Sequence, residues 1–170
     1  TLPHLERLSH FGLIDGTASA KGVAILHMGN YATLNQGHIN GSLVNGLEDD
    51  AAAALGVPLA SSFDNMASGV FNAGAVVDLG AGGVLRNAGT LGIGAVPGIG
   101  STVLTGHLDQ QAGGVLHIDA DMAGGKADSL QISGTATIAG TVHVAPTSVS
   151  NRGLKVLTAS GGLALDPSLA

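Results

Sequence analysis

Histidine is the residue type in this chain best suited to chemistry, and the chain has seven of them. His107, His117 and His143 occupy alternate positions in short apolar segments, so they face outward if the flanking aliphatic residues face a core. Stacked strands would place these imidazoles in a ladder able to hold a metal ion. No two of them have a short ligand-type spacing, and no cysteine joins them. We therefore favour three solvent-facing strand positions and predict no metal site.

Three aspartates, Asp119, Asp121 and Asp128, bracket a short loop of sequence MAGGKA. Clustered carboxylates can bind calcium through their oxygens. However, the glycine- and aspartate-rich nonapeptide of calcium-binding β-rolls is absent. Aspartate also forms turns by accepting hydrogen bonds from its own backbone, and this simpler role is the one we expect.

Catalytic groups are sparse. Glycoside hydrolysis needs two carboxylates that converge on a groove, and the only glutamates are Glu6 and Glu48. Asp15 and Asp78 could meet on one face of a solenoid, but no lysine, arginine or aromatic sugar platform accompanies them. No G-x-S-x-G elbow or phosphate-binding loop is present either. We expect a protein that is not an enzyme and needs no cofactor.

Short β-strands are the elements that must position all these residues. The stretch SLQISGTATIAGTVHVAP (129–146) alternates apolar and polar residues, and glycines interrupt it every six or seven positions. A period of two is typical of half-buried strands, and the glycines favour tight turns. Six side chains are expected to face inward: Leu130, Ile132, Ala136, Ile138, Val142 and Val144.

A loose repeat extends this pattern toward the N-terminus. Similar segments begin at Gly12, Gly37, Gly74 and Gly89, and the stretches before them carry an apolar residue followed by asparagine or its neighbour. An irregular repeat of roughly 20–25 residues predicts an all-β solenoid whose coils carry insertions of variable length.

Composition agrees with a uniform stack of small strands. Glycine contributes 28 of 170 residues, charged residues make up 11%, aromatic residues 2%, and hydrophobic residues 45%. The net charge is −6 and the six cations are scattered singly, which argues against nucleic acid and anionic membranes as partners.

The chain divides into three predicted parts. Residues 1–11 form a terminal extension, either frayed or a short helix. Residues 12–97 form coils, with a projecting loop at 46–65 that contains one or two helical turns. Residues 98–170 form a denser C-terminal β segment, since the alternation tightens after Pro97.

The stretch from Asn87 to Thr158 resembles the passenger region of Gram-negative autotransporters (type V secretion). NAGTLGIG is similar to the N-x-G-T-I coil of that family, and GGVLHIDAD followed by ADSLQISGTATIAGTVHV is similar to the pattern near the C-terminal end of the passenger. The residues that fit are Gly114, Leu116, Ile118, Asp119, Asp128, Leu130, Ile132, Gly134, Ala136, Ile138, Gly140, Thr141 and Val142.

This resemblance implies a right-handed parallel β-helix that ends in an autochaperone-like segment, which promotes folding and secretion of a surface-displayed passenger. The parent would be an adhesin or another virulence factor outside a Gram-negative cell. Its partners would be its own C-terminal outer-membrane β-barrel, expected outside these residues, and the outer-membrane assembly machinery, with a host surface or glycan left open. The folding template would be Leu116, Ile118 and the six inward residues of 129–144. The alternative is a β-helix that binds or degrades polysaccharide, of the tailspike or lyase type.

Overall fold

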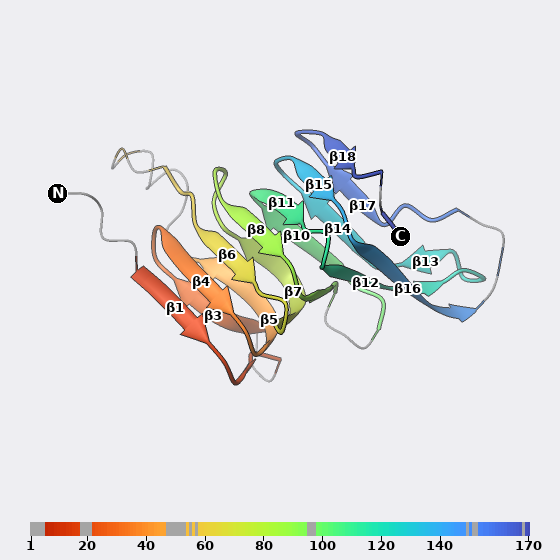
Figure 1. Cartoon of the computed structure of the whole chain (residues 1–170), viewed down its shortest axis with the longest axis horizontal. Coiled ribbons are helices and arrows are strands. Elements are labelled where there is room, and N and C mark those ends of the chain that lie inside the picture. Colours follow the sequence, from red (N-terminus) through yellow and green to blue (C-terminus); the bar gives the residue numbers. More distant parts are fainter. Residues whose placement is uncertain are drawn as a thin grey trace.

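The computed structural model describes residues 6–17, 22–46, 54, 56, 58–94, 98–148, 150, 153–167 and 169–170. The elements in this part are strands, and they stack in parallel into a β-solenoid of about five turns (Figure 1). The predicted all-β parallel solenoid is confirmed.

One strand from each coil enters a seven-stranded sheet, and all neighbours in this sheet are parallel. Its strands, in spatial order, are β1 (Glu6–His10), β4 (Tyr31–Asn35), β6 (Ser62–Asn65), β8 (Val84–Asn87), β11 (His107–Gln110), β15 (Ala136–Ile138) and β18 (Leu163–Leu165).

The other strands form an eleven-stranded sheet that consists of two rows. The first row is β2 (Leu13–Asp15), β5 (His38–Asn45), β7 (Val70–Asp78), β9 (Thr90–Gly92), β12 (Val115–Asp121) and β16 (Thr141–Ser148). The second row contains β3 (Val23–His27), the distal parts of β5 and β7, β10 (Ser101–Thr105), β14 (Ser129–Ile132) and β17 (Leu157–Ala159). The short β13 (Lys126–Ala127) pairs antiparallel with the end of β12.

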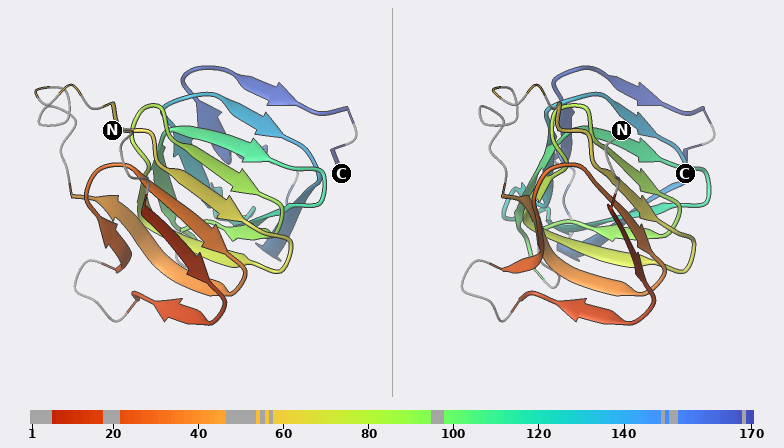
Figure 2. Two further views of the ribbon diagram at one scale, coloured as in Figure 1. Left: turned by 60° about the vertical axis from the view of Figure 1, so that its left-hand side comes forward. Right: turned by 90° about the vertical axis from the view of Figure 1, so that its left-hand side faces the viewer.

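The long strands β5 and β7 run through both rows, which is why the two rows count as one sheet. Irregularities in the pairing between Gly41 and Leu43 mark the bend. In the coils that follow, separate strands take over the two rows, first β9 and β10 and then β12 and β14. Figure 2 shows the coils superposed around one shared interior.

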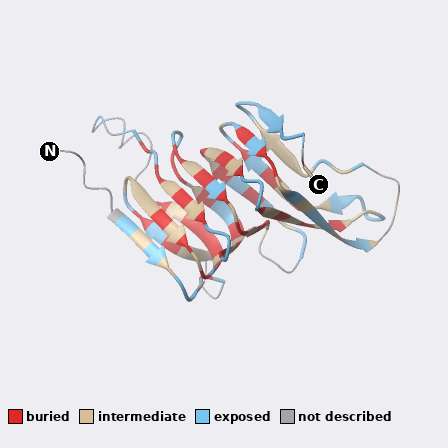
Figure 3. Ribbon diagram, in the orientation of Figure 1, coloured by how far each residue is buried: buried red, intermediate tan, exposed pale blue. Residues whose placement is uncertain are grey.

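Burial alternates along the stacked strands (Figure 3), as a period of two requires. Because the coils stack in register, inward residues form columns, for example Phe63, Leu85, Leu108 and Ala136 in the seven-stranded sheet. These columns merge into one apolar core that includes residues from Ile25 to Ile138.

Glycines line one corner of the solenoid, where the seven-stranded sheet meets the first row. At this corner the N–H of the residue after each glycine donates to the carbonyl of the glycine one coil below, as Thr90 does to Gly69 at 2.9 Å and Thr141 to Gly114 at 3.0 Å. A Cβ atom at Gly89 would run into the carbonyl oxygen of Gly69, so this close approach requires glycine. The column consists of Gly12, Gly37, Gly69, Gly89, Gly114 and Gly140.

This column corrects the predicted repeat. The third anchoring glycine is Gly69 and not Gly74, because Gly74 lies further along β7 and packs against Ser42. The prediction failed because an insertion lengthens the second coil and hides the true spacing.

The predicted boundaries also change. Residues 6–10 are strand β1, paired with β4, and so form neither a frayed end nor a helix. Ser62–Asn65, assigned to the projecting loop, form β6 inside the sheet. Most of 46–57, including the expected helical turns, lies outside the described residues. One core crosses the predicted boundary at 97/98, because β10 pairs with β7 on one side and with β14 on the other.

Candidate functional site

The side chains predicted as a folding template lie mainly inside the core. Leu116, Ile118, Leu130, Ile132, Ala136 and Ile138 are all buried, and Val142 is half-buried and packs against them. They come from four strands of the last complete coils: β12, β14, β15 and β16.

Val144 is an exception to this pattern and corrects the prediction. It is the register partner of the fully buried Ile118, so it lies on the same side of its strand, yet 38% of it is exposed. β16 belongs to the last turn of the solenoid. The inward side of this turn is only partly covered, and alternation alone cannot tell a covered turn from an uncovered one.

The glycines that fit the autotransporter pattern lie at corners of the coils. Gly114 and Gly140 belong to the glycine column, and Gly140 adopts a positive φ of 75°. The N–H of Thr141 donates to Gly114. Gly134 lies at a different corner, where its N–H donates to the carbonyl of Gly106 at 2.8 Å.

Two of the three histidines considered in the sequence analysis lie side by side, with their rings tilted by 37°. His117 in β12 and His143 in β16 are register partners, with ring centroids 5.0 Å apart and Nδ1 atoms 3.2 Å apart. His107 lies in the other sheet, where its Nδ1 is 2.8 Å from the hydroxyl of Thr135. The three-membered ladder is therefore reduced to a pair.

The aspartates beside this pair have structural partners. Asp128 is completely buried, and its two carboxylate oxygens accept hydrogen bonds from the N–H groups of Gly100 at 2.8 Å and Asp119 at 2.7 Å. Burial raises the pKa of Asp128, although these two hydrogen bonds oppose the rise.

Asp121 accepts hydrogen bonds from the Ser148 hydroxyl at 2.6 Å and the Gly124 N–H at 3.0 Å. The Ser148 bond is the main cause that lowers the pKa of Asp121, and the Gly124 bond adds to it. Asp121 closes a turn within its own loop and also links β12 to β16, as a turn-forming aspartate can.

Asp15 and Asp78 are not brought together. Asp15 pairs in register with Asn40 in the first row, whereas Asp78 pairs with Thr105 in the second. The carboxylate pair considered for glycoside hydrolysis is therefore not formed. Within the described residues, no group of three histidine, cysteine, aspartate or glutamate side chains is arranged to hold a metal ion.

A buried amide ladder escaped the sequence analysis. Asn35 donates to Asn65 at 2.8 Å, Asn65 to Asn87 at 2.7 Å, and Asn87 to Gln110 at 2.7 Å, each from its side-chain nitrogen to the next side-chain oxygen. All four side chains are buried at the ends of strands in the seven-stranded sheet. The signal was present, since an amide residue closes each of the segments TLN, FDN, LRN and LDQ.

The C-terminal end of the solenoid bears an apolar groove of about 310 Å³. Leu163 and Leu165 of β18 line it and are exposed, Leu165 to 60%. The groove is also lined by Leu154, Val156 and Leu169 and by the buried Leu116 and Ile138.

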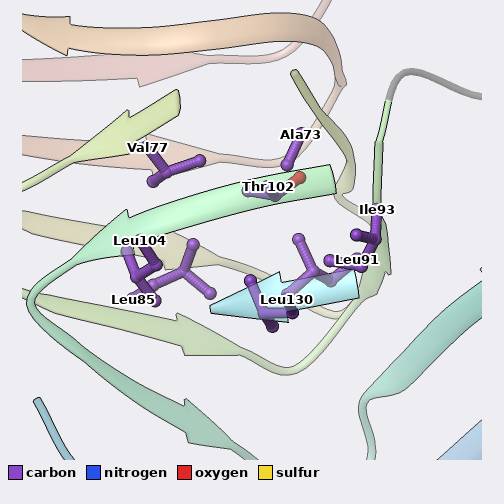
Figure 4. A pocket seen from close by; sticks show the side chains of 8 residues that line it. All are labelled: Ala73, Val77, Leu85, Leu91, Ile93, Thr102, Leu104 and Leu130. Atoms are coloured by element: carbon purple, nitrogen blue, oxygen red, sulfur yellow. The ribbon is translucent and has the colours of Figure 1, made fainter. Parts of the chain in front are cut away.

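The middle of the core, in contrast, is closed. Eight side chains converge there (Figure 4) and leave only about 10 Å³ between them, less than a ligand needs. They are Ala73, Val77, Leu85, Leu91, Ile93, Thr102, Leu104 and Leu130.

Comparison with protein-family models, with curated proteins and with solved structures found no match to this chain. In the described part of the chain, no helix is both long and apolar enough to cross a membrane.

Proposed function

We propose that this chain is a non-catalytic folding and display module of an autotransporter passenger, exposed at the surface of a Gram-negative cell. One observation carries the proposal. The stretch that resembles the autochaperone segment supplies the last complete coils, and its inward side chains belong to the same core as the coils before it.

The mechanism follows from parallel stacking. Each coil presents a row of unpaired N–H and C=O groups along its edge, and an arriving strand can pair with them and bury its alternate side chains. In this stack β9 and β10 pair with β12 and β14, so the earlier coils meet the edge of the last complete coils. A stable block at the C-terminal end of the stack would hold in place the part of the chain that has emerged from the outer membrane. It would thereby oppose the return of the chain through that membrane.

Surface display of the intact parent tests the proposal, because inward and outward positions alternate along the same strands. Leu130→Asp and Ile138→Asp place an unpaired carboxylate in the core, which is costly, and we expect them to reduce folded, protease-resistant passenger at the cell surface. Gln131→Asp and Thr137→Asp are matched controls at exposed neighbouring positions and should display normally.

His117→Ala and His143→Ala should also leave display unchanged, because both rings lie on the outward face. Normal display of both inward variants, or failure of the two histidine variants, would contradict a role carried by the core.

A further inference from the structure

The paired imidazoles of His117 and His143 have the separation of two ligands of one metal ion. Zinc–nitrogen bonds of about 2.0–2.1 Å at a tetrahedral angle place two nitrogens roughly 3.3 Å apart. The two Nδ1 atoms are 3.2 Å apart in the structure.

A carboxylate fixes the orientation and the tautomer of the first ring. Nε2 of His117 lies 3.3 Å from Oδ1 of Asp119, two residues along the same strand. An ionised carboxylate only accepts hydrogen bonds, so Nε2 of His117 carries the hydrogen and Nδ1 presents its lone pair toward His143. A histidine that binds a metal through one ring nitrogen usually donates the N–H of the other nitrogen to a carboxylate that does not touch the metal. Asp119 occupies the position of that carboxylate relative to His117.

Asp119 is itself held in place from two directions. Its Oδ2 accepts a hydrogen bond from the N–H of Gly98 at 3.2 Å, and its own N–H donates to the buried Asp128 at 2.7 Å. The carboxylate that orients His117 is therefore positioned before any ion arrives.

The site is open to solvent. His143 is exposed, and the register partner of His117 on the other side is Gly92, which has no side chain. An ion between the two rings would have two protein ligands and would keep positions for water, as open zinc sites do.

We propose that His117 and His143 form a two-histidine site for a divalent transition-metal ion, with Zn²⁺ as the best fit, and that Asp119 is the positioning residue. In the absence of metal, Nδ1–H of His143 donates to Nδ1 of His117. In the bound state the ion takes the place of that hydrogen, and the hydrogen of His143 moves to Nε2.

Titration of the folded chain with zinc chloride tests the site, with calorimetry for stoichiometry and NMR of the histidine ring protons for location. We expect one Zn²⁺ per chain and shifts confined to the rings of His117 and His143. His117→Ala and His143→Ala should each abolish this binding, and Asp119→Asn should weaken it roughly tenfold.

His107→Ala is the matched control, because His107 is also on a strand, β11 of the seven-stranded sheet, where its Nδ1 lies 2.8 Å from the Thr135 hydroxyl. It should bind zinc as the unmodified chain does. Far-UV circular dichroism of every variant verifies that the solenoid is intact. Absence of zinc binding, its persistence in the double variant His117→Ala/His143→Ala, or an equal loss in His107→Ala would overturn the proposal.

Discussion

At the scale of single residues, the buried amide ladder is the most consequential polar feature. Asn35, Asn65, Asn87 and Gln110 connect four successive coils through the interior of one corner. The ladder stops at Gln110, whose side-chain nitrogen has no hydrogen-bond partner among the described residues, because the next residue in register is Ile138. Buried amides are stabilising only while their partners remain, so truncation of one member also affects its neighbours.

Asn65→Ala is therefore predicted to destabilise the fold by about 1–3 kcal/mol, since the side-chain oxygen of Asn87 loses its donor. Urea unfolding followed by circular dichroism measures this change. Asn72→Ala is the control: it removes a comparable hydrogen bond, to Asn40, at a half-buried position. If Asn72→Ala lowered the free energy of unfolding as much as Asn65→Ala, burial of the ladder would contribute no additional stability.

Asp128 predicts a dependence of stability on pH. Its folded-state pKa is raised by burial, so the native state binds more protons than the unfolded state between the ordinary carboxyl pKa of about 3.9 and the raised value. The stabilising contribution of this group is therefore complete below the unfolded pKa and is lost as pH rises through the folded pKa.

The stability of the chain relative to Asp128→Asn should accordingly increase as pH falls from neutral toward about 4. Comparison of the two proteins cancels the carboxylates that they share, among them Asp121. Urea unfolding of both at several pH values measures the difference. A decrease in the stability of the chain relative to Asp128→Asn as pH falls would mean that the hydrogen bonds from Gly100 and Asp119 outweigh desolvation.

At the scale of elements, the corners determine whether coils can stack. A Cβ at Gly114 would collide with the carbonyl oxygen of Asn87 and approach Nε2 of Gln110 to 2.9 Å. For the neighbouring Gly113, the nearest atom of the described residues to a Cβ would be the Ala88 oxygen, at 3.9 Å.

Gly114→Ala is predicted to destabilise the chain by about 1–3 kcal/mol, as overpacking does, whereas Gly113→Ala should change stability little. Thermal and urea unfolding of the two variants measure the contrast between adjacent residues. Equal effects would contradict the close approach of coils at this corner.

The accuracy of the predictions made from the sequence also differs between elements. The alternation in 129–144 correctly predicted five buried or half-buried template positions there, because a period of two is a local property. Val144 was wrong because its exposure depends on whether another coil covers it. The histidine ladder, which the sequence analysis considered but did not favour, forms only in part. Contact between His117 and His143 requires only that β12 and β16 be neighbours, but His107 belongs to another sheet.

The amide ladder was missed, and the glycine column was only partly predicted, for a related reason. Both depend on coil length, which varies: 30 residues separate Asn35 from Asn65, but 22 separate Asn65 from Asn87. The insertion after β5 shifts the repeat, so the asparagine that precedes the wrongly chosen anchor Gly74 is Asn72 and not the ladder residue Asn65. Residue types were visible in the sequence, but register was not.

At the scale of the whole molecule, one core joins the coils described from β1 to β18, without the division expected near residue 97. Such a stack is stabilised coil by coil, since each coil contacts mainly its neighbours. The fold therefore depends on the register in which successive coils pair. The proposed display function and the zinc site both depend on it.

Cysteine cross-linking tests this register most directly, because the chain has no cysteine of its own. Ser101 in β10 and Ser129 in β14 are register partners whose hydroxyl oxygens are 2.7 Å apart on the outer face. Neighbouring strands lie about 4.8 Å apart, which is within the range that a disulfide spans.

The double variant Ser101→Cys/Ser129→Cys should form an intramolecular disulfide under mild oxidation, detected by mass spectrometry, with the β-sheet spectrum retained. The control pair Ser101→Cys/Gln131→Cys is displaced by two residues, so its Cα atoms should be roughly 8 Å apart and should not cross-link. Efficient cross-linking of the register pair alone is the result predicted here. Failure of that pair, or equal cross-linking of the displaced pair, would contradict the stacking of the coils.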